Sequence, residues 1–180
     1  MEKSAQQDPV LKRLPLCFYT RDAKTVAIEL LGKTIVRRHS DGEIVKYIIT
    51  ETEAYLGEFD LACHASKGKT PRTEIMFTQG GVLYIYLIYG MYWMMNIVTG
   101  FENQAQAVLI RGIDKASGPG KTAALLQLSK EFNGESLLES NRIWLEDSNL
   151  VCRYKATPRI GVDYAGEFWK SQLLRFCAIV

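Results

Sequence analysis

The sequence contains little histidine and little cysteine, and its cysteines lie far apart. Among the 180 residues are two histidines and four cysteines, namely Cys17, Cys63, Cys152 and Cys177. No Cys-x-x-Cys pair is present, and two histidines are too few to complete the ligand sets that zinc sites usually need. We therefore expect reduced thiols, no disulfide framework, no metal and no cofactor.

A strong excess of charge of one sign is also missing. The formal net charge is +2, which is too small to indicate a nucleic-acid partner by itself. Basic residues are concentrated in two stretches, 64–73 and from 152 onward. Charge alone leaves two interpretations open: these stretches are solvated surfaces, or they are patches that meet an anionic partner.

No secretion signal is visible, and only one long apolar run exists. The first residues carry mixed charges and no apolar segment follows them, which predicts a protein that is not secreted. The run at 82–98 approaches the length of a membrane span, but tyrosines and Asn96 are spread along it and Gly90 interrupts it. We therefore expect this run to form a core strand and a functional surface, with no membrane partner.

The pattern of apolar residues and turn residues predicts one α+β domain over 14–180, preceded by a flexible tail over 1–13. Asp22 begins a stretch with helical apolar spacing that ends at Gly32. Strand-like runs at 34–38 and 43–55 are joined by a turn containing Asp41-Gly42, a strong hairpin signal. Further strands are predicted at 107–110, 143–145 and 159–162, and a short helix at 121–128. These elements favour a mostly antiparallel sheet with surrounding helices.

Two acidic residues and a tyrosine alternate within the second strand-like run. Glu51, Glu53 and Tyr55 would share one face of a strand, because side chains alternate between its faces. Spacing alone favours an edge strand whose acids meet nearby lysines or arginines. The alternative is that one acid is a general base. His64 follows nine residues after Tyr55, and a lone histidine is more often structural than catalytic.

The apolar run at 82–98 is rich in aromatic residues, most of which are expected to pack in the core. Tyr89-Gly90 differs, because glycine permits a tight bend that could present the tyrosine ring outward as a wedge. Gly120-Lys121-Thr122 matches the end of a phosphate-binding loop, but Lys115 occupies the first glycine position and Pro119 lacks a backbone donor. Nucleotide hydrolysis is therefore not expected there, whereas a contact between the Gly120 amide and a DNA phosphate remains open.

Taken together, these segments resemble the alkyladenine (3-methyladenine) DNA glycosylase family of the mammalian type. The resemblance extends in order from about Leu14 to Phe176. Its motifs are ETEAYLG at 51–57, His64, TPR at 70–72, MF at 76–77, YIYLIYGMYWMMN at 84–96, VLIR at 108–111, GPGK at 118–121 and TPRIGV at 157–162. Each motif is weak alone, and the ordered set is specific.

The resemblance implies a role for individual residues. Glu53 would activate the attacking water, with Arg111 holding the water and a neighbouring phosphate, while Glu51 is structural. Tyr55 would stack on an everted base, with His64 on the opposite side. The remaining implied roles are Tyr86 in the aromatic pocket, Asn96 excluding the amino group of normal guanine, and Tyr89 intercalating from a hairpin in the DNA minor groove. Candidates for contacts with the DNA backbone come from the basic stretch and the glycine-led helix start: Lys67, Lys69, Arg72, Gly120 and Lys121.

The implied activity is that of a monofunctional base-excision-repair glycosylase without lyase activity. Its substrate would be duplex DNA containing a damaged purine of the 3-methyladenine, 7-methylguanine, hypoxanthine or ethenoadenine class. A monomer is expected, cytoplasmic in a bacterium and nuclear in a eukaryote. Thr73, Cys63 and Tyr92 depart from the family pattern, Thr73 replacing asparagine and Tyr92 a frequent histidine. Two alternatives are a DNA-damage binder without activity and a small-molecule hydrolase or nucleotide-binding protein using the loop at 118–121.

Overall fold

The computed structural model describes residues 12–148 and 150–179. Most of the predicted tail lies outside these residues. Arg13, which was assigned to the tail, belongs instead to the fold: its guanidinium donates to the carbonyls of Leu138 and Ser140, and its backbone forms an isolated bridge with Glu146. The tail prediction was therefore wrong at this residue.

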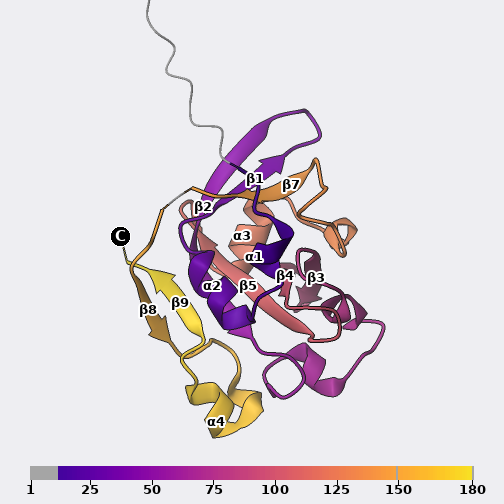
Figure 1. Cartoon of the computed structure of the whole chain (residues 1–180), viewed down its shortest axis with the longest axis vertical. Helices are drawn as coiled ribbons and strands as arrows, with labels where there is room; N and C mark the ends of the chain where they lie inside the picture. The colour runs from indigo at the N-terminus through magenta and orange to yellow at the C-terminus, as the bar shows by residue number, and fades with distance from the viewer. Residues whose placement is uncertain (1–11, 149, 180) are drawn as a thin grey trace, which may run out of the picture.

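A single antiparallel sheet organises the described part of the chain (Figure 1). The central path runs β3-β4-β5-β2-β1-β7, with β6 paired to β5 and a β8–β9 hairpin added through β9 to β2. The strands are β1 (Thr34–Arg38), β2 (Ile44–Tyr55), β3 (Leu83–Ile88), β4 (Tyr92–Thr99), β5 (Gln106–Ile113), β6 (Ala116–Ser117), β7 (Ile143–Glu146), β8 (Tyr154–Thr157) and β9 (Arg175–Ala178). This confirms the α+β class and the mostly antiparallel sheet.

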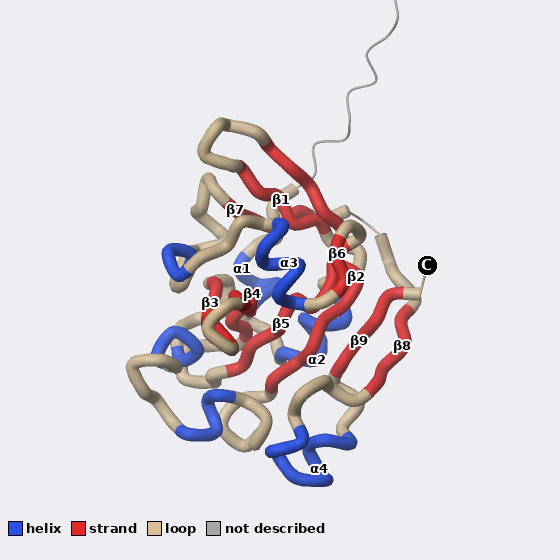
Figure 2. Tube along the Cα trace, turned by 180° about the vertical axis from the view of Figure 1, so that it is seen from behind, coloured by secondary structure: helices blue, strands red, loops and turns tan. Residues whose placement is uncertain are grey.

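The helices are short (Figure 2). They comprise α1 (Leu16–Tyr19), α2 (Ala23–Glu29), α3 (Pro119–Leu125) and α4 (Gly166–Ser171), with 3₁₀ turns η1 (His64–Lys67), η2 (Glu74–Phe77), η3 (Lys130–Phe132) and η4 (Asp163–Ala165). Among the described residues, no helix combines the length and apolar character that a membrane crossing requires. The apolar run at 82–98 instead forms the β3–β4 hairpin.

Local signals in the sequence correctly predicted helix α2 and the first hairpin, whereas the short α1 was not predicted. The side chain of Asp22 accepts a hydrogen bond of 2.9 Å from the Thr25 backbone and caps α2. The β1–β2 turn contains Gly42 at φ +89°, a conformation that suits glycine. The predicted helix at 121–128 corresponds to α3, which begins and ends earlier than expected.

The predicted strand at 159–162 was wrong. The local strand is β8, which ends at Thr157, and Pro158 and Gly161 (φ +74°) turn the chain away. Arg159 has apolar neighbours in the sequence, but its side chain is buried in a polar contact rather than forming part of a strand face.

Helix α2 packs against one face of β2, so a functional site on this strand has to lie on the opposite face. The hydroxyl of Thr52 donates 2.8 Å to the carbonyl of Ala27 in α2, and Ala54 joins the main core on that side. The alternate residues Glu51, Glu53 and Tyr55 therefore project from the opposite face, as predicted. Tyr55 is linked there to Glu53 by a hydrogen bond, and Arg111 connects the two acids through a hydrogen bond to Glu51 and an ion pair with Glu53.

Candidate active site

The strand that carries the acidic residues is a central one. β2 pairs with β1 along its first half and with both β5 and β9 along its second half. The expectation of an edge strand was therefore wrong. Glu51 and Glu53 do form ion pairs with arginines, as the edge-strand interpretation expected, but these pairs lie on a central strand.

Glu53 is fully buried, and the groups around its carboxylate are polar. Oε2 accepts 2.9 Å from the Tyr55 hydroxyl, Oε1 accepts 2.9 Å from the Ile160 backbone N–H, and Nη1 of Arg111 lies 3.4 Å from Oε1. Burial raises the pKa of Glu53, while Arg111 and then the two hydrogen bonds oppose that rise. Three donors directed at one carboxylate stabilise its ionised form, which is the form a base requires.

Glu51 holds Arg111 in position. Its Oε1 accepts 2.9 Å from Nε of Arg111 and 2.6 Å from Nε of Arg175. The β2–β5 register shifts on both sides of Glu51. Arg111 thus spans both acids, with Nε bound to Glu51 and Nη1 beside Glu53.

A second buried ion pair, which the sequence analysis missed, lies behind Tyr55. Arg159 donates to both carboxylate oxygens of Asp60, at 2.6 and 2.9 Å, and to the carbonyl of Ala54 at 3.0 Å. Its guanidinium carbon lies 4.8 Å from the centre of the Tyr55 ring. Since the next residue, Ile160, donates to Glu53, this segment contacts both Tyr55 and the carboxylate. Arg159 lies within the TPRIGV motif, but no local pattern identified Asp60.

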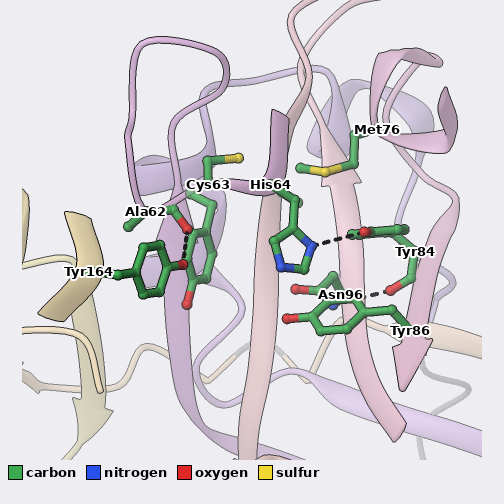
Figure 3. A pocket seen from close by; sticks show the side chains of 10 residues that line it. Ala62, Cys63, His64, Met76, Tyr84, Tyr86, Asn96 and Tyr164 are labelled. Atoms are coloured by element: carbon green, nitrogen blue, oxygen red, sulfur yellow. Dashed lines mark hydrogen bonds between the residues drawn. The ribbon is translucent and has the colours of Figure 1, made fainter. Parts of the chain in front are cut away.

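An inner slot lined by aromatic rings opens beside Tyr55 (Figure 3). Tyr164 lies on one side of it, and His64 and Tyr86 lie across from it. The His64 and Tyr86 rings are 4.6 Å apart, and Nδ1 of His64 lies 2.9 Å from the Tyr84 hydroxyl. The complete lining is Tyr55, Ala62, Cys63, His64, Met76, Tyr84, Tyr86, Asn96, Ala107 and Tyr164.

The inner slot adjoins an outer cleft of about 570 Å³, within the range of ligand pockets. The two hollows share Tyr55, His64, Tyr86 and Tyr164, and the slot itself has only about 40 Å³ of free volume. Arg111 lines the cleft, whereas Glu53 lines neither hollow and lies behind Tyr55 and Arg111, to which it is bound. The carboxylate is therefore one side chain away from the space that could hold a nucleoside.

His64 is held neutral. Burial, followed by the charges of Arg72 and Lys67, lowers its pKa to about 4. At neutral pH the ring therefore carries no charge. The neutral His64 ring therefore adds no charge repulsion against a positively charged ligand in the slot.

Asn96 is one of the residues that line the slot. It is buried on β4 opposite Tyr84, and its Nδ2 donates 3.1 Å to the Tyr84 carbonyl. This bond fixes the orientation of the amide toward the slot (Figure 3).

The tip of the β3–β4 hairpin presents Tyr89 to solvent. Tyr89 is 87% exposed, and it adopts φ +50°, followed by Gly90 at φ +69°. A bulky residue rarely adopts this left-handed conformation, so the turn keeps the ring outward at an energetic cost. Leu87 and Met91 beside it are also exposed, and Tyr89 forms part of the outer cleft.

Only some of the residues that were predicted to contact the DNA backbone lie at the outer cleft. Arg72 lines it, with its guanidinium carbon 5.4 Å from the Tyr86 ring centre, and Lys67 lines a third hollow next to it. Lys69 lies instead over Phe77, at 5.9 Å. Lys121 is exposed and lines none of these three hollows.

The three residues that depart from the family pattern are Thr73, Cys63 and Tyr92, and each is held by specific contacts or by burial. Thr73 is buried, and its hydroxyl donates 2.9 Å to the Gly68 carbonyl and accepts from the Thr70 backbone, so it supports the loop. Cys63 is buried, which raises the pKa of its thiol to about 11 and keeps it protonated. The ring of Tyr92 packs so closely on Gly120 that a Cβ there would lie 2.9 Å from it.

These features define a class of protein: an α+β domain with a slot lined by aromatic rings and a buried, ion-paired carboxylate close to it. The family model described as "Methylpurine-DNA glycosylase (MPG)" matches residues 17–116 and 112–179. The chain belongs to this family of hydrolytic N-glycosylases, which confirms the resemblance seen in its motifs.

Relatives from distant organisms match over most of both chains. A protein of Legionella pneumophila (strain Corby) is 46% identical over 176 residues, covering 92% of this chain and 94% of the relative. One from Methanocella arvoryzae is 44% identical over 174 residues, covering 86% of each chain. One from Wolbachia pipientis wMel is 44% identical over 172 residues, covering 91% of this chain and 93% of the relative. Each carries the name "Putative 3-methyladenine DNA glycosylase".

Proposed function

We propose that this chain is a monofunctional DNA glycosylase that everts a damaged purine from duplex DNA and hydrolyses its N-glycosidic bond with a water activated by Glu53. The observation that carries the proposal is the position of the Glu53 carboxylate. It lies behind a ring-lined slot and is held by Tyr55, Arg111 and the Ile160 backbone. The substrates are alkylated or deaminated purines of the 3-methyladenine, 7-methylguanine, hypoxanthine and ethenoadenine class.

DNA binding uses the face that contains the outer cleft. The β3–β4 hairpin enters the minor groove, and Tyr89 fills the gap that the everted nucleotide leaves. Eversion costs a few kcal/mol and costs least for damaged or mispaired bases. A ring inserted into the stack offsets part of that cost. Lys67 and Arg72 are placed beside the cleft to meet phosphates, whereas Lys69, Gly120 and Lys121 remain weaker candidates for such contacts.

The everted base enters the slot between Tyr55 on one side and His64 and Tyr86 on the other. The free slot is narrow, so the rings move apart to admit it. A cationic alkylpurine is attracted to aromatic faces by roughly 0.5–2 kcal/mol. The neutral state of His64 avoids a charge repulsion that would oppose this attraction. Asn96, which lines the slot, excludes the amino group of normal guanine.

Glu53 then acts as the base. Its raised pKa makes it a stronger proton acceptor than an ordinary glutamate. The water loses a proton to the carboxylate, its oxygen bonds to the anomeric carbon, and the bond electrons leave with the purine. Arg111 holds the water and a neighbouring phosphate. Because the nucleophile is water and not an amine, no Schiff base forms and the strand is not cut.

A panel of lesion duplexes tests this proposal. The chain is incubated with duplexes containing 7-methylguanine, hypoxanthine or ethenoadenine and with an undamaged control. Free base and alkali-labile abasic sites are then measured. We expect base release from at least one lesion duplex, abasic sites in equal amount and no strand cleavage before alkali. A protein that retards lesion DNA but releases no base would instead be a DNA-damage binder.

A further inference from the structure

Tyr164 occupies a position at the slot that neither its sequence context nor the proposed chemistry explains. It contributes to the inner slot, to the outer cleft and to a third hollow that is also lined by Lys67 and Arg72. In Figure 3 its ring lies across the slot from His64 and Tyr86. Tyr164 therefore lies where the three hollows meet.

The ring is held in this position although much of it faces solvent. Tyr164 is 70% exposed, and its hydroxyl donates 2.8 Å to the carbonyl of Ala62. It lies on η4, in a segment bounded by Gly161 (φ +74°) and Gly166 (φ +82°), whose left-handed turns suit glycine. The bond to Ala62 connects this segment to the chain just before His64.

An exposed aromatic ring has little reason to be tied over a cavity for packing alone. Its hydroxyl already has a partner, so the free surface of the residue is the ring itself. Aromatic faces attract flat rings, and they attract cationic rings more strongly. The exposed ring lies next to the slot that the proposed function assigns to the everted base.

We propose that Tyr164 is a specificity-determining wall of the base slot, whose ring contacts the everted nucleobase and favours cationic alkylpurines over neutral lesions. This inference rests on the proposed function. The hydroxyl bond to Ala62 serves to orient the ring. Contact with the base comes from the ring and does not require the hydroxyl.

The test compares Tyr164→Ala, Tyr164→Phe and the matched control Phe168→Ala on 7-methylguanine and hypoxanthine duplexes of the same sequence. Phe168 is an exposed aromatic residue on the neighbouring α4 and lines none of the three hollows. For Tyr164→Ala we expect kcat/KM to fall about 3- to 30-fold on 7-methylguanine, the range of one cation–π contact, and less on hypoxanthine. Tyr164→Phe, which keeps the ring, should retain more of the 7-methylguanine activity than Tyr164→Ala, and Phe168→Ala should stay within about 2-fold of wild type.

Affinity for a duplex with a stable abasic analogue separates base contact from damage to the fold. That duplex places no base in the slot, so Tyr164→Ala should bind it as the wild type does. Equal losses on both lesions, or a Tyr164→Phe loss as large as that of Tyr164→Ala, would show that the residue only ties two segments together and would overturn the inference. If the wild type releases no base from any lesion duplex of the panel, the proposed function itself fails, whereas normal turnover by Tyr164→Ala refutes only the role of Tyr164.

Discussion

The Tyr55 hydroxyl donates a 2.9 Å hydrogen bond to Oε2 of Glu53, two residues earlier on the same strand. In the proposed mechanism one side chain therefore serves two purposes: its ring stacks on the base, and its hydroxyl stabilises the ionised base catalyst. Burial, followed by the nearby charge of Glu53 and with a smaller contribution from this bond, raises the pKa of Tyr55, so the hydroxyl stays protonated and remains a donor.

Tyr55→Phe separates these two purposes, because it keeps the ring and removes the donor. A hydrogen bond to a charged group contributes about 1.5–3 kcal/mol. We therefore expect the single-turnover rate at neutral pH to fall by roughly 10- to 100-fold, with lesion-DNA affinity nearly unchanged. Rapid-quench measurement of base release checks this. A wild-type rate in Tyr55→Phe would show that the hydrogen bond does not support the chemistry.

The pH dependence of base release should show Glu53 titrating. Activity needs the ionised carboxylate, so it falls as pH decreases through the raised pKa of Glu53, at a higher pH than an ordinary glutamate would give. His64 titrates near 4, too low to produce this decline. His64→Gln should therefore lower the rate but keep the midpoint of the decline. A midpoint that disappears in His64→Gln would assign the titration to the histidine.

The Asp60–Arg159 pair should be a major contributor to stability around the site. Removing one partner of a buried ion pair typically costs about 3–5 kcal/mol, because the other charge stays buried and unpaired. We expect Asp60→Asn to lose stability in that range by urea unfolding. The double variant Asp60→Leu with Arg159→Met should recover only part of it, because the backbone N–H groups of Leu56 and Ala62, which donate to Asp60, lose their partner. A loss below about 1 kcal/mol in Asp60→Asn would show that the pair is dispensable for folding.

Tyr89 should matter for excision and not for folding. Tyr89→Gly removes the ring and suits the φ of +50° that the turn imposes. We expect its melting temperature to stay at or above that of the wild type, while excision from duplex DNA slows at least 10-fold. Single-stranded substrate needs no eversion and serves as the internal comparison. Unchanged duplex excision would mean that the ring does not intercalate.

The sequence predicted the elements whose signals are local. The Asp22 cap and the Asp41-Gly42 turn depend on neighbouring residues and are confirmed by the structure. Alternation along β2 correctly placed Glu51, Glu53 and Tyr55 on one face. Pairing between distant strands could not be inferred in this way, and so β2 was expected at an edge and β8 and β9 were missed.

Long-range contacts also explain which site residues were missed. Asp60 and Arg159 are 99 positions apart, and only the fold brings them together behind Tyr55. Tyr164 is an exposed aromatic residue in a polar segment, without periodicity that would indicate its place at the slot. Tyr55, His64, Tyr86 and Asn96, which were named through the family resemblance, all line the inner slot. The roles predicted for them stay predictions.

Single-turnover base release by Glu53→Gln tests the central claim most directly. Glutamine keeps the size of the side chain and removes the proton acceptor, so the variant should remain folded and bind a lesion duplex with near wild-type affinity. We predict base release at least 100-fold slower than wild type, at the lower end of what a general base contributes. Release within about 3-fold of the wild-type rate would contradict the account and remove Glu53 from the mechanism.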